Sequence, residues 1–307
     1  MNNYLLLLFN LINLIFIPLL LMGVIRKVKA LMQNRIGSPI LQPFYDLAKF
    51  LRKSETISQT ASWVFLWNPL IGLGVAVIAV LLVPWAGPLL PPSWAPATNF
   101  LLIIYLLSLG KFFAMLSAMD TGSAFGGIGA SREATISMLA EPALIIGLGA
   151  LALGNGSTDL LTIFSNPSNP FIAGLVGAAL VILALAELSR IPVDDPTTHL
   201  ELTMVHEAMI LENSGPNLAL TEYAVALRSC LFFGLAMQTL MHIAPGFYQL
   251  ELFPRYIISL AGLLGLGALV AVAEGVMVKL KWRSVPNFLA FGTVLSLLAA
   301  LIAVWPK

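Results

Sequence analysis

The chain has 307 residues, of which 59% are hydrophobic and 10% are charged, and its mean hydropathy is +0.92. Soluble domains carry about 25% charged residues, so this composition excludes a water-soluble globular protein. The net charge of +1 gives no electrostatic case for nucleic-acid binding. The single cysteine, Cys230, excludes an intrachain disulfide, and His199, His206 and His242 are too dispersed to predict a metal site.

Apolar runs of about 20 residues recur along the chain, and that length crosses the hydrocarbon core of a bilayer as a helix. A membrane β-barrel would instead show alternating segments of about ten residues. We therefore predict an all-α integral membrane protein, a single membrane domain over residues 1–307 with about eight transmembrane helices. The helices are expected at residues 3–25, 64–84, 98–119, 134–153, 171–188, 221–242, 256–279 and 285–305.

The first apolar run is expected to be an uncleaved transmembrane helix and not a signal peptide. No basic segment precedes residues 10–22, and basic residues follow them in place of a signal-peptide cleavage site. After it, residues 41–53 carry apolar side chains at about helical spacing with Lys49, Arg52 and Lys53 beside them. This pattern predicts an amphipathic helix in the interfacial plane.

The distribution of basic residues predicts the orientation of the chain in the membrane. Twelve basic residues lie in the loops on one side of the membrane, whereas the opposite side has only Arg255 and Lys307. The positive-inside rule therefore places loops 26–62, 120–133 and 187–221 in the cytoplasm and both termini outside. The twelve basic residues of the cytoplasmic loops are Arg26, Lys27, Lys29, Arg35, Lys49, Arg52, Lys53, Arg132, Arg190, Lys279, Lys281 and Arg283.

Several ionisable side chains lie within or at the ends of the predicted spans. Each costs a few kcal/mol in hydrocarbon, so it needs a partner, a water-filled cavity or the interface. Two interpretations stay open, a hydrated proton path and structural pairing near the headgroups. Glu141 precedes Pro142, which frees a backbone carbonyl, whereas Arg228 cannot release its proton and is expected to be a structural counter-ion. The group comprises Lys111, Glu141, Glu187, Glu222, Arg228 and Glu274.

Two of the predicted cytoplasmic loops have distinctive compositions. The glycine-rich segment 120–133 lacks the Gly-Lys-Ser/Thr ending of a phosphate loop and follows no strand, which argues against a nucleotide site. The segment 187–222 carries repeated carboxylates interleaved with apolar residues such as Met204 and Ile210. Neighbouring carboxylates raise each other's pKa and titrate as coupled groups, which suits proton transfer, and an ordinary solvated acidic face is the alternative.

Motifs in these loops resemble subunit 1 of respiratory complex I. Residues 186–194, Ala-Glu-Leu-Ser-Arg-Ile-Pro-Val-Asp, and the downstream Glu-Asn-Ser-Gly at 212–215 are similar to the family's A-E-x-x-R-x-P-F-D and E-Y-S-G motifs. Residues 34–43 resemble its R-x-G-P-x-x-x-Q-P/E motif. Asp-Thr-Gly-Ser at 120–123 and Gly-Ala-Ser-Arg-Glu at 129–133, with Glu141-Pro142, look closer to the membrane subunits of formate hydrogenlyase and group 4 energy-converting [NiFe]-hydrogenases.

The resemblance spans essentially the whole chain, but its glutamate run differs from the family pattern. Thr197 and His199 stand where the family has two further acids, and the segment from Glu201 to Glu212 is about three residues longer. The altered run weakens the case for a complex I-type quinone site, whereas the family roles of Glu187, Asp194, Glu201 and Glu212 carry over.

The resemblance implies a membrane anchor and ion-coupling subunit of a redox-driven, hydrogenase-like complex. Such a subunit links cytoplasmic electron transfer to proton (or sodium) translocation and binds no cofactor itself, with iron–sulfur clusters and possibly a [NiFe] site in partner subunits. The implied partners are hydrophilic iron–sulfur and hydrogenase-like subunits on the cytoplasmic side, antiporter-like membrane subunits and the lipid bilayer. The implied location is the plasma (inner) membrane of a prokaryote.

The site residues that we expect fall into two sets, with no catalytic or metal-binding residue. The expected proton path is Glu141, Glu187, Asp194, Glu201, Glu212, Glu222, Lys111 and Glu274. The expected partner-docking surface or quinone-like cavity is Arg35, Gln42, Asp46, Asp120, Arg132, Glu133 and Arg190. One alternative is a quinone-site subunit of a complex I-type NADH/ferredoxin:quinone oxidoreductase. In that case segments 41–53 and 122–129 would frame the portal through which the quinone enters. A more remote alternative is a stand-alone transporter.

Overall fold

The computed structural model describes residues 3–84, 98–166, 169–195, 204–244, 246–247 and 250–305. This part of the chain is helical and contains no β-strand. Seven of its helices are long and apolar enough to cross a membrane, or up to eight if a bent pair at the N-terminus is one span. The prediction of an all-α integral membrane protein with about eight spans is therefore confirmed.

The first span is broken into α1 (Asn3–Ile15) and α2 (Ile17–Met32), which meet at an angle of 44°. Proline cannot donate a backbone hydrogen bond, so Pro18 leaves the carbonyl of Leu14 without its helical partner. The hydroxyl of Tyr223 donates to that carbonyl at 2.5 Å. A side chain from another helix thus satisfies the backbone where the span bends.

The loop expected from residue 26 begins later than predicted, because α2 continues to Met32. Lys29 lies in the last turn of α2, where a cation is favoured by the helix dipole. The amphipathic helix predicted after the first span is α3 (Gln42–Leu51), and the ring of its Phe44 lies 6.3 Å from that of Phe16.

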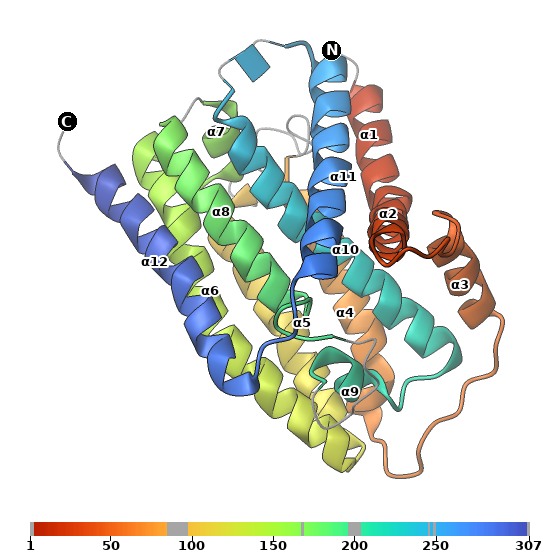
Figure 1. Cartoon of the computed structure of the whole chain (residues 1–307). Helices are drawn as coiled ribbons and strands as arrows, with labels where there is room; N and C mark the ends of the chain where they lie inside the picture. The colour runs from red at the N-terminus through yellow and green to blue at the C-terminus, as the bar shows by residue number, and fades with distance from the viewer. Residues whose placement is uncertain are drawn as a thin grey trace.

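The remaining long helices form a bundle around α10 (Figure 1). The side chains of Leu227, Leu231 and Phe233 on α10 are fully buried. On one side α10 packs against α4 and on the other against α8, while α12 covers α6 and α8, and α11 packs along α2. The bounds of these helices are α4 Trp63–Leu82, α5 Phe100–Asp120, α6 Ala124–Asn155, α8 Pro170–Glu187, α10 Gly215–Met241, α11 Leu252–Val276 and α12 Val285–Val304.

The largest differences from the predicted helix starts are at α6 and α10, which both begin earlier. α6 begins at Ala124 rather than near 134, so most of the glycine-rich segment is helical. A Cβ added to Gly126 would lie 2.3 Å from the Ala118 carbonyl oxygen, so close packing outweighs the low helix propensity of glycine. α10 begins at Gly215 rather than at 221, with Pro216 in its first turn, where proline is tolerated.

Three short elements were not predicted: α7 (Leu160–Ser165), α9 (His206–Ile210) and the 3₁₀ turn η4 (Trp282–Ser284). Figure 1 shows α9 at the end of the bundle opposite the two labelled chain ends, together with the start of α6 and the connection between α3 and α4. α9 lies within the acidic segment, so that segment is partly ordered against the bundle.

Candidate functional site

A lysine inside the bundle lies among carboxylates from two neighbouring helices. Lys111, in the middle of α5, is only 4% exposed. Its Nζ lies 2.8 and 3.0 Å from the two carboxylate oxygens of Glu187, at the end of α8. It also lies 2.9 Å from Glu141 Oε1 and donates to Ser137 Oγ at 2.9 Å, both on α6. We call Lys111, Glu133, Ser137, Glu141 and Glu187 the lysine cluster.

The spacing of α6 explains how it supplies three members of the lysine cluster. Glu133, Ser137 and Glu141 are four residues apart and therefore share one helix face. Glu133 is 4% exposed and interacts electrostatically with Lys111 and with Arg228 of α10. Glu133 was expected in the docking set, but the structure places it in the interior beside the expected path residues.

The two carboxylates that pair with Lys111 differ in their exposure. The Glu141 side chain is 28% exposed, whereas that of Glu187 is 2% exposed. A cavity of about 20 Å³ is lined by Lys111, Glu141 and Glu187 together with apolar side chains, and it has room for about one water molecule. A buried ion pair is costly to desolvate, so its members depend on one another to remain charged.

Three further ion pairs connect α2, α11 and the segment after α8. Glu274 of α11 accepts from Arg190 at 2.9 Å and lies 3.5 Å from Lys29 Nζ of α2. Glu274 was expected in the proton path and Arg190 in the docking set, and the structure brings the two together. Asp194, 1% exposed, accepts from Lys279 Nζ at 2.7 Å and from the Val205 backbone N–H at 2.8 Å. Asp194 therefore anchors the chain just before α9.

A polar cavity of about 230 Å³, the large cavity, opens between α2, the segment after α8, α9, α10 and α11. An adjoining cavity of about 150 Å³ lies beneath α3 and shares Arg26 and Glu222 with it. Asp46, which accepts from Gln42 at 2.9 Å and pairs with Arg26 at 3.2 Å, lines the second. The charged and imidazole side chains of the large cavity are Arg26, Lys29, Arg190, Asp194, His206, Glu207, Glu222 and Glu274.

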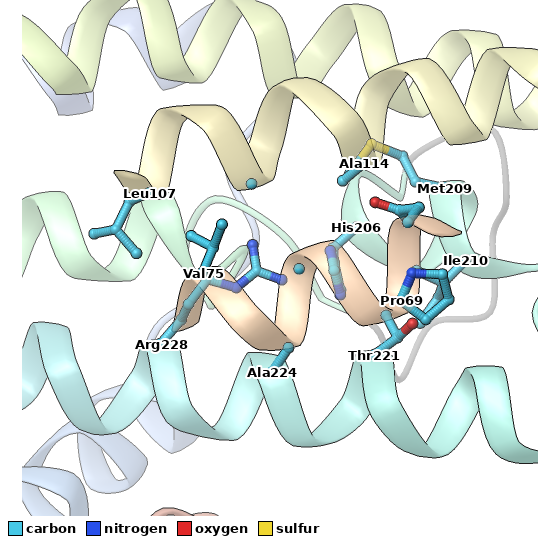
Figure 2. A pocket seen from close by; sticks show the side chains of 13 residues that line it. Pro69, Val75, Leu107, Ala114, His206, Met209, Ile210, Thr221, Ala224 and Arg228 are labelled. Atoms are coloured by element: carbon cyan, nitrogen blue, oxygen red, sulfur yellow. The ribbon is translucent and has the colours of Figure 1, made fainter. Parts of the chain in front are cut away.

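A third space, the small cavity, has a volume of about 30 Å³ and lies between α4, α5, α9 and α10. Figure 2 shows the side chains of His206 and Arg228 entering it from α9 and α10. His206 Nε2 and Arg228 Nε are buried and have no hydrogen-bond partner in the part of the chain that the structure describes. Burial, and then the charge of Arg228, lower the pKa of His206 from 6.5 to about 3, so its imidazole is neutral at physiological pH.

Other predicted residues do not join these cavities. Asp120 accepts from the backbone N–H groups of Ser62 at 2.7 Å and Phe65 at 3.3 Å, so it caps the start of α4. Arg132 donates to the Met204 carbonyl at 3.0 Å and lies over the ring of Trp282. Arg35 and Glu212 are exposed at the surface, and Glu201 lies outside the described residues.

Sequence reasoning missed three residues. Ser137 could have been found, because it lies midway between Glu133 and Glu141 at helical spacing. Lys279 and His206 carry no comparable signal, because Asp194, which pairs with Lys279, and Arg228, which shares a cavity with His206, lie in other parts of the sequence. Within the described ranges, no group of three His, Cys, Asp or Glu side chains could hold a metal ion.

Known proteins resemble this chain over nearly its whole length. The sequence model of the NADH dehydrogenase family matches residues 5–305. Hydrogenase-4 component C of Escherichia coli is 29% identical over 287 residues, covering 90% of this chain and 88% of that protein. Formate hydrogenlyase subunit 4 of the same organism is 29% identical over 302 residues, covering 92% and 94%.

Relatives with quinone oxidoreductase names align over less of the chain. A subunit of the NADH-quinone oxidoreductase of Rubrobacter xylanophilus is 28% identical over 233 residues, covering 68% of each chain. These comparisons do not favour the alternative of a quinone-site subunit. A solved structure of the membrane-bound sulfane sulfur reductase, an archaeal respiratory membrane complex, has a similar fold, with a TM-score of 0.76 and 21% identity over 99% of this chain and 100% of the other.

Proposed function

The chain belongs to the NADH dehydrogenase family, and we propose that it is the membrane anchor and ion-coupling subunit of a redox-driven, hydrogenase-like complex. Two relatives that align over most of its length are named as parts of hydrogenase-4 and formate hydrogenlyase. The observation that carries the proposal is the buried Lys111, which lies within 3.0 Å of carboxylates from both α6 and α8.

Charge balance in the lysine cluster supports a role in proton transfer. Lys111 and Arg228 face three carboxylates, those of Glu133, Glu141 and Glu187. Full ionisation therefore leaves one negative charge uncompensated, and a single bound proton neutralises it. Because Lys111 Nζ is 2.8 Å from Glu187 and 2.9 Å from Glu141, a small shift toward either one releases the other to bind that proton.

In this proposal, the redox chemistry belongs to partner subunits. A cubane iron–sulfur cluster needs four ligands that are usually cysteines, and this chain has one cysteine, which is buried in α10. Hydrophilic subunits with iron–sulfur clusters and possibly a [NiFe] site would dock at the end of the bundle that carries the large cavity. Antiporter-like subunits would pack beside the chain within the membrane and receive the translocated ion.

We further propose that the chain lies in the plasma membrane of a prokaryote with both termini outside. Glu251 and Lys281 are exposed and lie beyond opposite ends of α11. Because Cys230 is buried, a cysteine introduced at either position can be labelled selectively. A membrane-impermeant maleimide should label Glu251→Cys in intact cells and Lys281→Cys only in inverted vesicles, and the reverse pattern would refute this orientation.

The coupling role is tested with Glu141→Gln in the intact complex reconstituted in sealed vesicles. The substitution keeps the shape of the side chain but removes its proton exchange, so ions moved per redox turnover should fall at least tenfold. The redox rate in detergent should stay within twofold of wild type. Glu251→Gln is the matched control, since this exposed carboxylate lies at the start of α11 and is not part of the lysine cluster. If Glu141→Gln couples as well as the control, the proposed function is wrong.

A further inference from the structure

Three cavities follow one another from α2 toward the lysine cluster. They are the large cavity, the small cavity and the cavity of about 20 Å³ at Lys111. His206 is the residue that the linings of the large and small cavities have in common. Leu107 is the residue shared by the small cavity and the cavity at Lys111. The imidazole therefore forms the wall between a polar, charged space and the space that leads to Lys111.

The small cavity provides a place for water. Its volume of about 30 Å³ accommodates about two water molecules. The buried Nε2 of His206 and Nε of Arg228 have no partner among the described residues, and both side chains point into the space shown in Figure 2. Buried polar atoms in native proteins are almost always hydrogen-bonded, to ordered water where no protein group is within reach. Water between these two side chains would satisfy both atoms.

We infer that His206 carries protons between the large cavity and the lysine cluster, an inference that rests on the proposed ion-coupling function. A neutral imidazole accepts a proton at one ring nitrogen and releases the proton at the other, so the ring ends neutral with its tautomer exchanged. Arg228 is the other ionisable group of the small cavity and does not release its proton. His206 is thus the residue of this lining that is able to transfer one.

The surroundings of His206 make its protonated form short-lived. Burial and the guanidinium of Arg228 oppose a second positive charge at this point, so a proton passes without being stored there. Additional negative charge in the large cavity would lower that barrier. The charged groups that line the cavities beside His206 are Arg26, Lys29, Arg190, Asp194, Glu207, Glu222 and Glu274 in the large cavity and Arg228 in the small one. The neighbouring helices add Arg132 and Glu133 on α6 and Lys111 and Asp120 on α5, and Lys279 pairs with Asp194.

The backbone around α9 is fixed in a way that holds His206 in this wall. The Val205 N–H donates to Asp194 at 2.8 Å, and the Met204 carbonyl accepts from Arg132 at 3.0 Å. Gly129 allows α9 to lie directly against α6, since a Cβ there would be 2.8 Å from the Val205 carbonyl oxygen. Three contacts from α6 and from the segment after α8 therefore position a helix of only five residues.

The test compares variants of His206 in the intact complex in sealed vesicles. His206→Leu keeps an apolar wall but has no ring nitrogen, and His206→Ala opens a space that added imidazole can fill. Both should assemble, retain redox turnover and move at least fivefold fewer ions per turnover. Millimolar imidazole should restore at least half of the wild-type number of ions moved per turnover in His206→Ala and have no effect in His206→Leu. Met209→Leu, a volume-conserving change on the same short helix, is the control.

The outcomes separate this inference from the proposed function. If Glu141→Gln uncouples the complex while His206→Leu keeps the ratio of Met209→Leu, the coupling role stands and the role of His206 is refuted. A loss in His206→Ala that imidazole does not restore would equally refute it, because a purely structural defect predicts that result. If Glu141→Gln itself has no effect, the proposed function fails first.

Discussion

Lys111 is stable as a cation in the bundle because carboxylates from two helices surround it. Removing one member of a buried ion pair leaves an uncompensated charge and costs about 3–5 kcal/mol. The nearest groups, at 2.8 to 3.0 Å, are Glu187, Glu141 and Ser137. Lys111 and Arg228 together face three carboxylates, so a single proton completes the charge balance, and a closed one-to-one pair would not have that property.

At the same scale, His206 should make stability depend on pH. Its folded-state pKa of about 3 lies below the unfolded value of 6.5, so its neutral form favours the folded state. That contribution is fully present above about pH 6.5 and is lost as the pH falls toward 3. At pH 5 the loss amounts to about 2 kcal/mol. Thermal stability of the complex should therefore decline more steeply from pH 7 to pH 5 in wild type than in His206→Gln. Parallel curves would contradict this.

The side chains of the lysine cluster could be predicted from the sequence better than their pairing. Lys111, Glu141 and Glu187 stand out as charges inside apolar runs. Their partners were not evident, because the contacts join residues 26 and 76 positions apart. Glu133 was assigned to a surface loop because a glycine-rich segment was expected to be irregular. No local signal indicates that His206 and Arg228 would share a cavity.

At the scale of elements, glycines decide where α6 begins and where α9 rests. Gly126 and Gly129 each face a backbone carbonyl at a distance that excludes a Cβ, whereas Gly127 has no neighbour within 4 Å. Glycine weakens a helix on propensity alone, so the sequence favoured a loop over residues 120–133. Tertiary packing reverses that preference, and such packing cannot be deduced before the partner helix is known.

Substitutions at these glycines test the contact. Gly129→Ala should destabilise the protein by about 1–3 kcal/mol, because either α9 or α6 must shift to admit the methyl group. Gly127→Ala should be neutral or stabilising by up to about 1 kcal/mol, since alanine favours the helix and meets nothing. The midpoint of thermal unfolding of the two variants, purified side by side, provides the comparison. Equal midpoints would show that α9 does not rest on Gly129.

The bend of the first span also could not be predicted from the apolar pattern. A continuous helix over residues 3–25 satisfies the apolar pattern, yet Pro18 divides it and Tyr223 takes the freed carbonyl of Leu14. Hydropathy detects the span and not its geometry. The positions of the amphipathic helix α3 and of the transmembrane segments could be predicted because they follow from periodicity and length alone.

Over the described residues, the bundle holds a series of cavities, a polar one beside α2 and two smaller, mostly apolar ones that lead to Lys111. The large cavity is lined by α2, α9, α10 and α11, and the lysine cluster lies between α5, α6 and α8. This arrangement accounts for both ion pairing and water access within one subunit. In the proposed function, electron transfer belongs to other chains, and this chain converts their charge movements into ion movement.

If Lys111 couples redox turnover to ion movement, the ratio of ions moved to electrons transferred by the intact complex must depend on this side chain. The ratio would be measured in sealed vesicles for wild type, Lys111→Met and Lys111→Arg, each normalised to assembled complex. We expect the ratio to be at least tenfold lower in Lys111→Met, with redox turnover retained in detergent. The ratio should fall less in Lys111→Arg, which keeps the charge. A Lys111→Met complex that assembles and moves as many ions per electron as wild type would contradict it.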